Sequence, residues 1–176
     1  PRSPSMQKKL NLKVKYRESF RPFAPSILSE KVNEWFDLDI DSPYMSIVAN
    51  LNKDKHHKIT TKEKNLFGFK KLNIHRSTVP AITHVDYSAR VQSVHKDTNP
   101  LYYSLIKNFN DKTGCPIIVN TSFNVRGEPI ICSPTDAFNC FMATELDLLA
   151  IGNFILIKEE QNKSLKINYK DNYNLD

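Results

Sequence analysis

The sequence predicts an α/β domain in which helices flank a twisted, mixed β-sheet. Strand-like and helix-like segments alternate through the second half of the 176-residue chain, a pattern typical of this fold class. The apolar run at 116–120 has the length and composition of a short buried strand. Hydrophobic residues make up 40 % of the chain, which is enough to fill one core.

The first half carries weaker structural signals. Residues 10–18 fit either a short helix or the entry to a strand, and residues 29–36 fit one or two helical turns. We expect a strand over 45–51 because apolar residues dominate there. The polar segment 52–71 is expected to be an irregular loop.

The second half carries clearer signals. We expect four further elements in chain order: two strands within 79–95 broken near 87–89, a helix over 99–110, a helix that opens at Ser133, and a closing strand over 148–157. Pro100 suits a first helical turn, and Ser133 suits an N-cap. One domain is therefore predicted over 1–160, followed by a polar tail over 161–176.

Charge and composition narrow the classes of protein. The net charge is +6, which favours an anionic partner such as a phosphate, a nucleotide or nucleic acid. A solvated lysine-rich surface is the alternative, above all for 53–71. No apolar run approaches the roughly 20 residues that a spanning helix needs, so we expect no membrane contact. The three cysteines lack metal-site spacing, and reduced, buried thiols would fit a cytoplasmic protein.

A basic cluster near the N-terminus is the first candidate site. Lys15, Arg17 and Arg21 lie within seven positions, and Pro22 fixes the backbone beside Arg21. A fixed guanidinium offers a planar fork to phosphate or carboxylate oxygens, whereas lysine supplies a point charge. Surface ion pairing with Glu18 is the alternative interpretation.

A polar loop after the buried strand is the second candidate. Asn120, Ser122 and Asn124 follow the apolar run, and ligand sites in open α/β sheets lie beyond the carboxyl ends of strands. Hydroxyl and amide groups at such a loop can hold phosphate oxygens or a small polar group. An ordinary Asn/Ser turn is the competing interpretation.

The third candidate lies in the strand-like segment at 83–92. His84, Asp86 and Arg90 alternate there, so they can share one face of a strand. His84 and Asp86 lack a third partner nearby, and we therefore predict no metal held by protein ligands. The chain has four glycines and no Walker A sequence. Any phosphate would thus be bound by side chains.

Several motifs together resemble one known family. The sequence Lys15-Tyr16-Arg17-Glu18-Ser19-Phe20-Arg21-Pro22-Phe23-Ala24-Pro25 is similar to a signature of the NodU/CmcH O-carbamoyltransferases. Three further motifs fall in the same order as in that family: Ser42-Pro43-Tyr44-Met45, Ala81-Ile82-Thr83-His84-Val85-Asp86 with Ala89-Arg90-Val91-Gln92, and Asn120-Thr121-Ser122-Phe123-Asn124 with Gly127-Glu128-Pro129-Ile130. The resemblance runs from Pro1 to about Lys158. Tyr87 departs from it, since many members have glycine there.

The resemblance implies a fold, a reaction and partners. It implies a YrdC-like C-terminal domain that takes ATP and carbamoyl phosphate and forms carbamoyl adenylate, with Mg²⁺ accompanying the nucleotide. A metal-dependent N-terminal domain of the actin/sugar-kinase-like type would pass the carbamoyl group to a hydroxyl acceptor. We interpret Pro1-Arg2 as the end of an arginine-rich boundary segment, with that N-terminal domain missing.

The resemblance also implies roles for particular residues. Lys15, Arg17 and Arg21 would contact the phosphates of carbamoyl phosphate or ATP, and Arg90 would hold the same anions. The other expected ligand contacts, to the carbamoyl group or an α-phosphate oxygen, come from Asn120, Ser122 and Asn124. His84 and Asp86 would either line the cleft or brace Arg90.

Two other functions stay open at this point. A YrdC-like module could bind RNA or a nucleotide without catalysis, helped by the basic segment 53–71, although its few aromatic residues make nucleic acid an unfavoured partner. A domain that is inert without its partner is the second alternative. The sequence does not name the hydroxyl acceptor.

Overall fold

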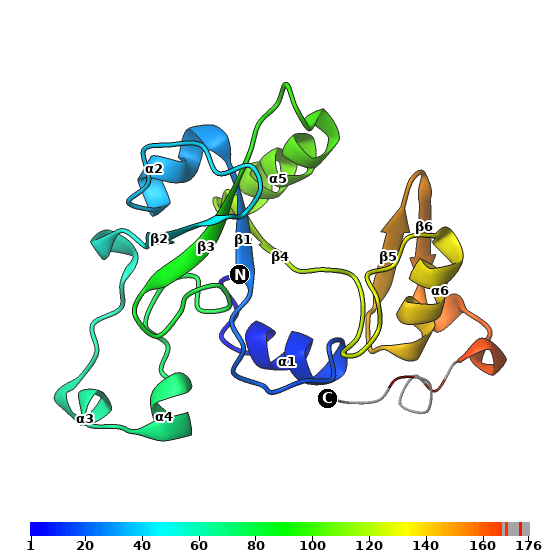
Figure 1. Cartoon of the computed structure of the whole chain (residues 1–176), viewed down its shortest axis with the longest axis horizontal. Helices are drawn as coiled ribbons and strands as arrows, with labels where there is room; N and C mark the ends of the chain where they lie inside the picture. Colours follow the sequence, from blue (N-terminus) through cyan, green and yellow to red (C-terminus); the bar gives the residue numbers. More distant parts are fainter. Residues whose placement is uncertain (167, 169–172, 174–176) are drawn as a thin grey trace. The chain divides into compact units, whose positions relative to one another are not determined.

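The computed structural model describes residues 1–166, 168 and 173. The chain divides into two compact units (Figure 1). The first unit contains Pro1–Gln7 and Phe20–Thr121, and the second contains Lys8–Ser19 and Ser122–Asp176. The single domain boundary at residue 160 stays a prediction.

The first unit is built on a four-stranded sheet with the order β2-β3-β1-β4. Its strands are β1 (Ala24–Leu28), β2 (Ile47–Asn50), β3 (Ser88–Val94) and β4 (Ile117–Asn120). β1 runs parallel to β3 and antiparallel to β4, and β2 runs antiparallel to β3. The predicted α/β class with a mixed sheet and flanking helices is therefore confirmed.

Helix α5 (Pro100–Thr113) packs on this sheet, where it buries Ile106 against Leu28 and Val94. The Asn99 side chain accepts a hydrogen bond from the Tyr102 amide at 3.3 Å and caps the start of the helix. Gly114 ends it in the left-handed conformation, with φ of 68°. The predicted helix is confirmed and extends through Thr113.

The polar segment after β2 is more regular than predicted. It contains the 3₁₀ turn η2 (Lys53–Lys55) and the short helices α3 (Thr61–Lys64) and α4 (Gly68–Leu72). Thr60 and Glu63 form a reciprocal capping box at the start of α3. Before β2, residues 29–36 form η1 (Ser29–Lys31) and α2 (Val32–Trp35), as the expected helical turns.

The expectation of two strands within 79–95 was wrong for its first half. Only β3 forms there, whereas the backbone before it turns on itself. The Ile82 amide bonds to the Val79 carbonyl, and the Tyr87 amide bonds to the His84 carbonyl. Val79, Ala81 and Ile82 are buried within these turns, whereas Val85 is exposed, so the apolar residues of this segment do not indicate a strand.

The second unit contains most of α1 (Met6–Lys13) together with α6 (Pro134–Ala143) and the hairpin β5 (Leu148–Ile151) and β6 (Phe154–Ile157). The 3₁₀ turns η3 (Lys158–Glu160) and η4 (Lys163–Leu165) follow. The predicted closing strand was wrong, because Gly152, with φ of 56°, breaks it into two antiparallel strands. Phe141 of α6 is buried against Leu149 of the hairpin.

Two other expectations concern the thiols and the tail. Cys115 and Cys140 are buried as expected, but Cys132 is exposed. The predicted tail over 161–176 includes η4, and most of the rest lies outside the described residues. No helix in the described part of the chain is both long and apolar enough to span a membrane.

Candidate functional site

Lys15 joins two motifs of the second unit that lie far apart in the sequence. Its Nζ donates to the carbonyl and hydroxyl oxygens of Ser122 at 2.8 and 3.2 Å. It also donates to the carbonyl and side-chain oxygens of Asn124, both at 2.7 Å. Four oxygens thus share the three ammonium protons of Lys15. The structure therefore brings Lys15, Ser122 and Asn124 together.

The environment of Lys15 disfavours its charged form. The residue is buried, and all four oxygens around Nζ are neutral. Burial lowers the pKa of Lys15 to about 8, and the neighbouring charge of Arg17 acts in the same direction. The ammonium is therefore held by oriented dipoles, with Glu128 as a carboxylate that favours the charge from further away.

A turn held by Asn11 positions the basic residues around Lys15. The buried Asn11 accepts from Arg17 Nε at 2.7 Å through its side chain and from the Arg17 amide at 3.0 Å through its carbonyl. Between the two cations, Tyr16 adopts a left-handed backbone with φ of 49°. Its hydroxyl donates to the Ala143 carbonyl at 2.7 Å and anchors the turn. The sequence analysis missed Asn11, because a lone polar residue in a helix carries no distinctive signal.

The loop that follows β4 is held by its own hydrogen bonds. Ser122 Oγ donates to Asn124 Oδ1 at 2.7 Å, and Asn124 Nδ2 donates to the Glu128 carbonyl at 2.7 Å. The buried Glu128 accepts from the Val125 amide at 2.8 Å. Gly127 adopts φ of 80°, which suits glycine in the tight turn. The Ser122 and Asn124 oxygens are thereby fixed in place by the loop itself.

The sheet of the first unit carries a row of polar side chains. Gln92 Oε1 accepts from Ser26 Oγ and from Asn120 Nδ2, both at 2.7 Å. Gln92 Nε2 donates to the Pro43 carbonyl at 3.1 Å, so its amide orientation is set by partners on both sides. Ser26 pairs with Gln92 across β1 and β3. Three strands and the Pro43 loop therefore meet at Gln92.

Arg90 shares this face of the sheet. It lies two positions before Gln92 on β3, and alternate residues of a strand point to the same side. Arg90 is exposed, and its cross-strand neighbour on β2 is Val48, which is also exposed. Arg21 is exposed too and precedes β1 by three positions. The structure thus brings Arg90 and Asn120 to one face through Gln92.

His84 and Asp86 form the turn that leads into β3. Asp86 Oδ1 accepts from the Ser88 amide at 3.0 Å and from its hydroxyl at 2.7 Å, and these bonds lower the pKa of Asp86. The His84 amide donates to the Ser88 carbonyl at 2.8 Å. Burial lowers the pKa of His84, with Asp86 opposing the shift and Arg90 adding to it. The Asp86 side chain thus holds the backbone at Ser88, two positions before Arg90, and His84 Nδ1 lies 3.3 Å from the Ser88 hydroxyl.

The residue between this turn and β3 adopts a rare conformation. Tyr87 has φ of 67°, in the left-handed region that favours glycine. Its ring stacks on His56 with a centroid distance of 4.0 Å, and its carbonyl accepts from the Leu51 amide at 2.8 Å. Burial lowers the pKa of the buried Arg76, and the nearby Tyr87 and Asp86 oppose this shift. The sequence analysis overlooked Arg76.

The predicted site residues fall into two sets. Lys15, Arg17, Ser122 and Asn124 lie in the second unit, whereas Arg21, His84, Asp86, Arg90 and Asn120 lie in the first. Their binding roles stay predictions. Within the described residues, no cluster of three or more His, Cys, Asp or Glu side chains could hold a metal ion.

Comparison with known proteins connects these motifs to one family. The family model described as "Carbamoyltransferase C-terminus" matches residues 1–158. An uncharacterised protein of Synechocystis is 58 % identical over 161 residues, which cover 92 % of this chain and 26 % of that relative. The nodulation protein NolO of Bradyrhizobium diazoefficiens is 39 % identical over 161 residues, covering 90 % of this chain and 26 % of NolO.

A relative named for its reaction is more distant. The 3'-hydroxymethylcephem-O-carbamoyltransferase of Amycolatopsis lactamdurans is 31 % identical over 123 residues, which cover 70 % of this chain and 19 % of that enzyme. The chain thus spans about a quarter or less of the length of these relatives. The resemblance based on the motifs is confirmed, and the chain belongs to the carbamoyltransferase C-terminal family.

Proposed function

We propose that this chain is the carbamoyl-activating part of an O-carbamoyltransferase, which binds carbamoyl phosphate and ATP and forms carbamoyl adenylate. The preceding region of the full-length enzyme would then transfer the carbamoyl group to a hydroxyl acceptor. One observation carries the proposal: the Lys15 ammonium is bound by both Ser122 and Asn124, so two family motifs 107 residues apart form one cluster.

The proposed reaction has two balanced steps. Water cleaves carbamoyl phosphate to carbamate and inorganic phosphate, which are both anions. A carbamate oxygen then forms a bond to the α-phosphorus of ATP while the bond from that phosphorus to pyrophosphate breaks. No nucleophilic side chain is consumed, and the main demand on the protein is to hold anions in line and to offset their repulsion.

The proposed anion contacts come from fixed cations and oriented polar groups. Arg21 and Arg90 are both exposed, and a guanidinium group can pair with phosphate oxygens through two parallel hydrogen bonds. The Lys15 ammonium contributes positive charge to the Ser122–Asn124 loop, where the Ser122 hydroxyl and the Asn124 amide lie beside it. Within the first unit, the Asn120 amide group lies on the same sheet face as Arg90, because both flank Gln92 on that face.

The carboxylates near these residues already accept hydrogen bonds from other groups of the protein. Asp86 binds Ser88, and Glu128 binds the Val125 amide. Since no cluster of three metal-binding side chains exists among the described residues, Mg²⁺ would be held by ATP phosphates and water. It would offset phosphate charge, while the chain's own residues orient the two substrates.

The test is carbamoyl-phosphate-dependent ATP–pyrophosphate exchange by the full-length enzyme. We expect Arg90→Ala and Arg21→Ala each to lower the exchange rate at least 100-fold, because loss of one charge-assisted contact to the reacting phosphates costs about 2.7 kcal/mol or more. Lys107→Ala is the matched control, since it removes a cation on α5 that is paired with Asp111 at 2.5 Å. Near-normal exchange in both arginine variants would contradict the proposal.

A further inference from the structure

A cavity of about 470 Å³ lies in the first unit where β3 gives way to α5. The end of β3, the loop around Pro43 and the first turn of α5 line it. Because β1 and β3 are parallel and α5 follows β3, the cavity lies at the carboxyl end of a parallel strand pair. Ligands of α/β sheets bind at this place, and the volume lies within the range of small-molecule sites.

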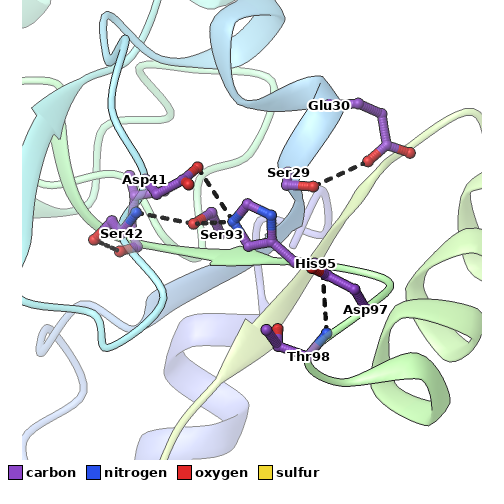
Figure 2. A network of polar contacts seen from close by, with 9 residues as sticks. Ser29, Glu30, Asp41, Ser42, Ser93, His95, Asp97 and Thr98 are labelled. Atoms are coloured by element: carbon purple, nitrogen blue, oxygen red, sulfur yellow. Dashed lines mark hydrogen bonds and ion pairs between the residues drawn. The ribbon is translucent and has the colours of Figure 1, made fainter.

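The wall of the cavity is held by a network of hydrogen bonds between polar residues (Figure 2). The Ser42 amide donates to Ser93 Oγ at 2.9 Å, and the Ser93 amide donates to the Ser42 carbonyl at 2.9 Å. His95 Nε2 lies 3.2 Å from Asp41 Oδ1 and 3.3 Å from Ser93 Oγ, as Figure 2 shows. Asp41 and Ser93 meet the same ring nitrogen, so the trio does not form the relay of a serine hydrolase, which uses both nitrogens.

The charges of the cavity exclude a phosphate as its main occupant. Asp41 and Asp97 both line it, and a phosphate would meet their negative charge. The start of α5 offers no compensation, because Asp97 Oδ1 accepts from the Thr98 amide at 3.0 Å and the Asn99 side chain accepts from the Tyr102 amide. The cavity therefore suits an uncharged group that carries hydroxyls.

Two further features fit a flat ring with a hydroxylated sugar. Tyr44 and Tyr102 line the cavity, and Tyr44 is 87 % exposed, so its ring is open for stacking on a ligand. The Asp41 carboxylate is three-quarters exposed, and His95 fixes its position. A carboxylate in such a place accepts hydrogen bonds from ribose hydroxyls.

The cavity is continuous with the proposed anion-binding face through Gln92. This residue lines the cavity and also holds Ser26 and Asn120. Arg90 lies two positions away on the same side of β3, which is about 6.6 Å along a strand. A ligand with its uncharged part in the cavity would thus place an attached phosphate chain near a cation.

We propose that this cavity holds the nucleoside part of ATP, with Tyr44 against the base and Asp41 against the ribose. The assignment rests on the proposed function, because it locates one part of a substrate that the reaction needs. It makes Asp41 and Tyr44 specificity residues that distinguish a nucleotide from an inorganic polyphosphate.

The experiment compares two probes, ATP and inorganic tripolyphosphate, by calorimetric titration of the full-length enzyme. We expect Tyr44→Ala and Asp41→Asn each to weaken ATP binding about tenfold, the effect of losing one stacking or charge-assisted contact. Tripolyphosphate binding should stay unchanged in both. Phe67→Ala and Asp111→Asn are the matched controls, since both positions are exposed and neither lines the cavity.

The outcomes separate this inference from the proposed function. Unchanged ATP affinity in both variants, or an equal loss of ATP and tripolyphosphate affinity, overturns the nucleoside assignment and leaves ATP use intact. An unmodified enzyme that binds no ATP overturns both. Arg90→Ala should weaken both probes, which marks the phosphate end of the site.

Discussion

At the residue scale, Lys15 is a motif residue that the sequence singled out, but its hydrogen-bond partners in the structure were not predicted. The sequence placed it in a basic cluster aimed at phosphate. In the structure its ammonium is satisfied by Ser122 and Asn124, which are more than a hundred positions away. The sequence could not reveal this, because only the fold brings the loop to the lysine. Lys15 therefore orders the loop as well as supplying charge.

The lowered pKa of Lys15 predicts an alkaline limit on activity. Above about pH 8 the folded protein loses this proton, and a neutral amine has two protons and a lone pair to face four oxygens. We expect ATP–pyrophosphate exchange by the full-length enzyme to fall as the pH rises through about 8. Lys15→Arg should remove this limb, because a guanidinium stays charged.

The measurement is the pH profile of exchange, with circular dichroism as a check that the arginine variant folds. Lys107→Ala, which changes an exposed helix position, should keep the profile of the unmodified enzyme. A folded Lys15→Arg enzyme that retains the same alkaline limb would show that another group titrates.

At the scale of the elements, prediction succeeded where local chemistry decides the structure. α5 and α6 begin with an Asn-Pro and a Ser-Pro pair, and both helices form where these signals lie. Prediction failed over 79–87, where Val79, Ala81 and Ile82 are buried in turns, and over 148–157, where a single glycine divides one apolar run. Hydrophobicity alone does not tell whether an apolar segment forms a strand, a turn or a hairpin, because this depends on hydrogen-bond partners that the tertiary structure supplies.

The cap of α6 can be tested directly. Ser133 Oγ accepts from the Asp136 amide at 3.1 Å, and Asp136 Oδ2 accepts from the Ser133 amide at 3.0 Å. We expect Ser133→Ala to lower the free energy of unfolding by about 1 kcal/mol, the usual contribution of an N-cap. Urea denaturation measures this change. Ser104→Ala, inside α5, should cause no loss, and an equal loss in both variants would refute the capping role.

At the scale of the whole molecule, the sequence named individual candidate residues but not the contacts that surround them. The sequence named Arg90 and Asn120, and the structure adds Gln92 as the residue that joins Asn120 to the Pro43 loop. The cavity beside it was not foreseen, because its walls come from three segments that carry no shared sequence signal. The two relatives matched over most of this chain are about four times longer than the matched part, which leaves room for the proposed transfer step in the rest of the full-length protein.

If activation and transfer are carried out by different parts of the enzyme, the chain alone and the full-length enzyme should form different products. We expect the chain alone to form no O-carbamoylated product from a hydroxylated acceptor that the full-length enzyme carbamoylates. The physical reason is that the proposed acceptor site belongs to the preceding region. Mass spectrometry of the acceptor after incubation with ATP and carbamoyl phosphate measures the outcome. Product formation by the chain alone would locate an acceptor site here.

The hydrogen bonds of Lys15 also bear on how the protein is made. They link positions 107 and 109 residues apart. Closing so long a loop costs conformational entropy, which is offset only by the contacts of the complete fold. During synthesis, Lys15 leaves the ribosome long before Asn124 does. A nascent chain interrupted before residue 122 would carry this lysine in water, with an ordinary pKa and no loop to hold. The cluster can thus form only after translation has passed the second motif.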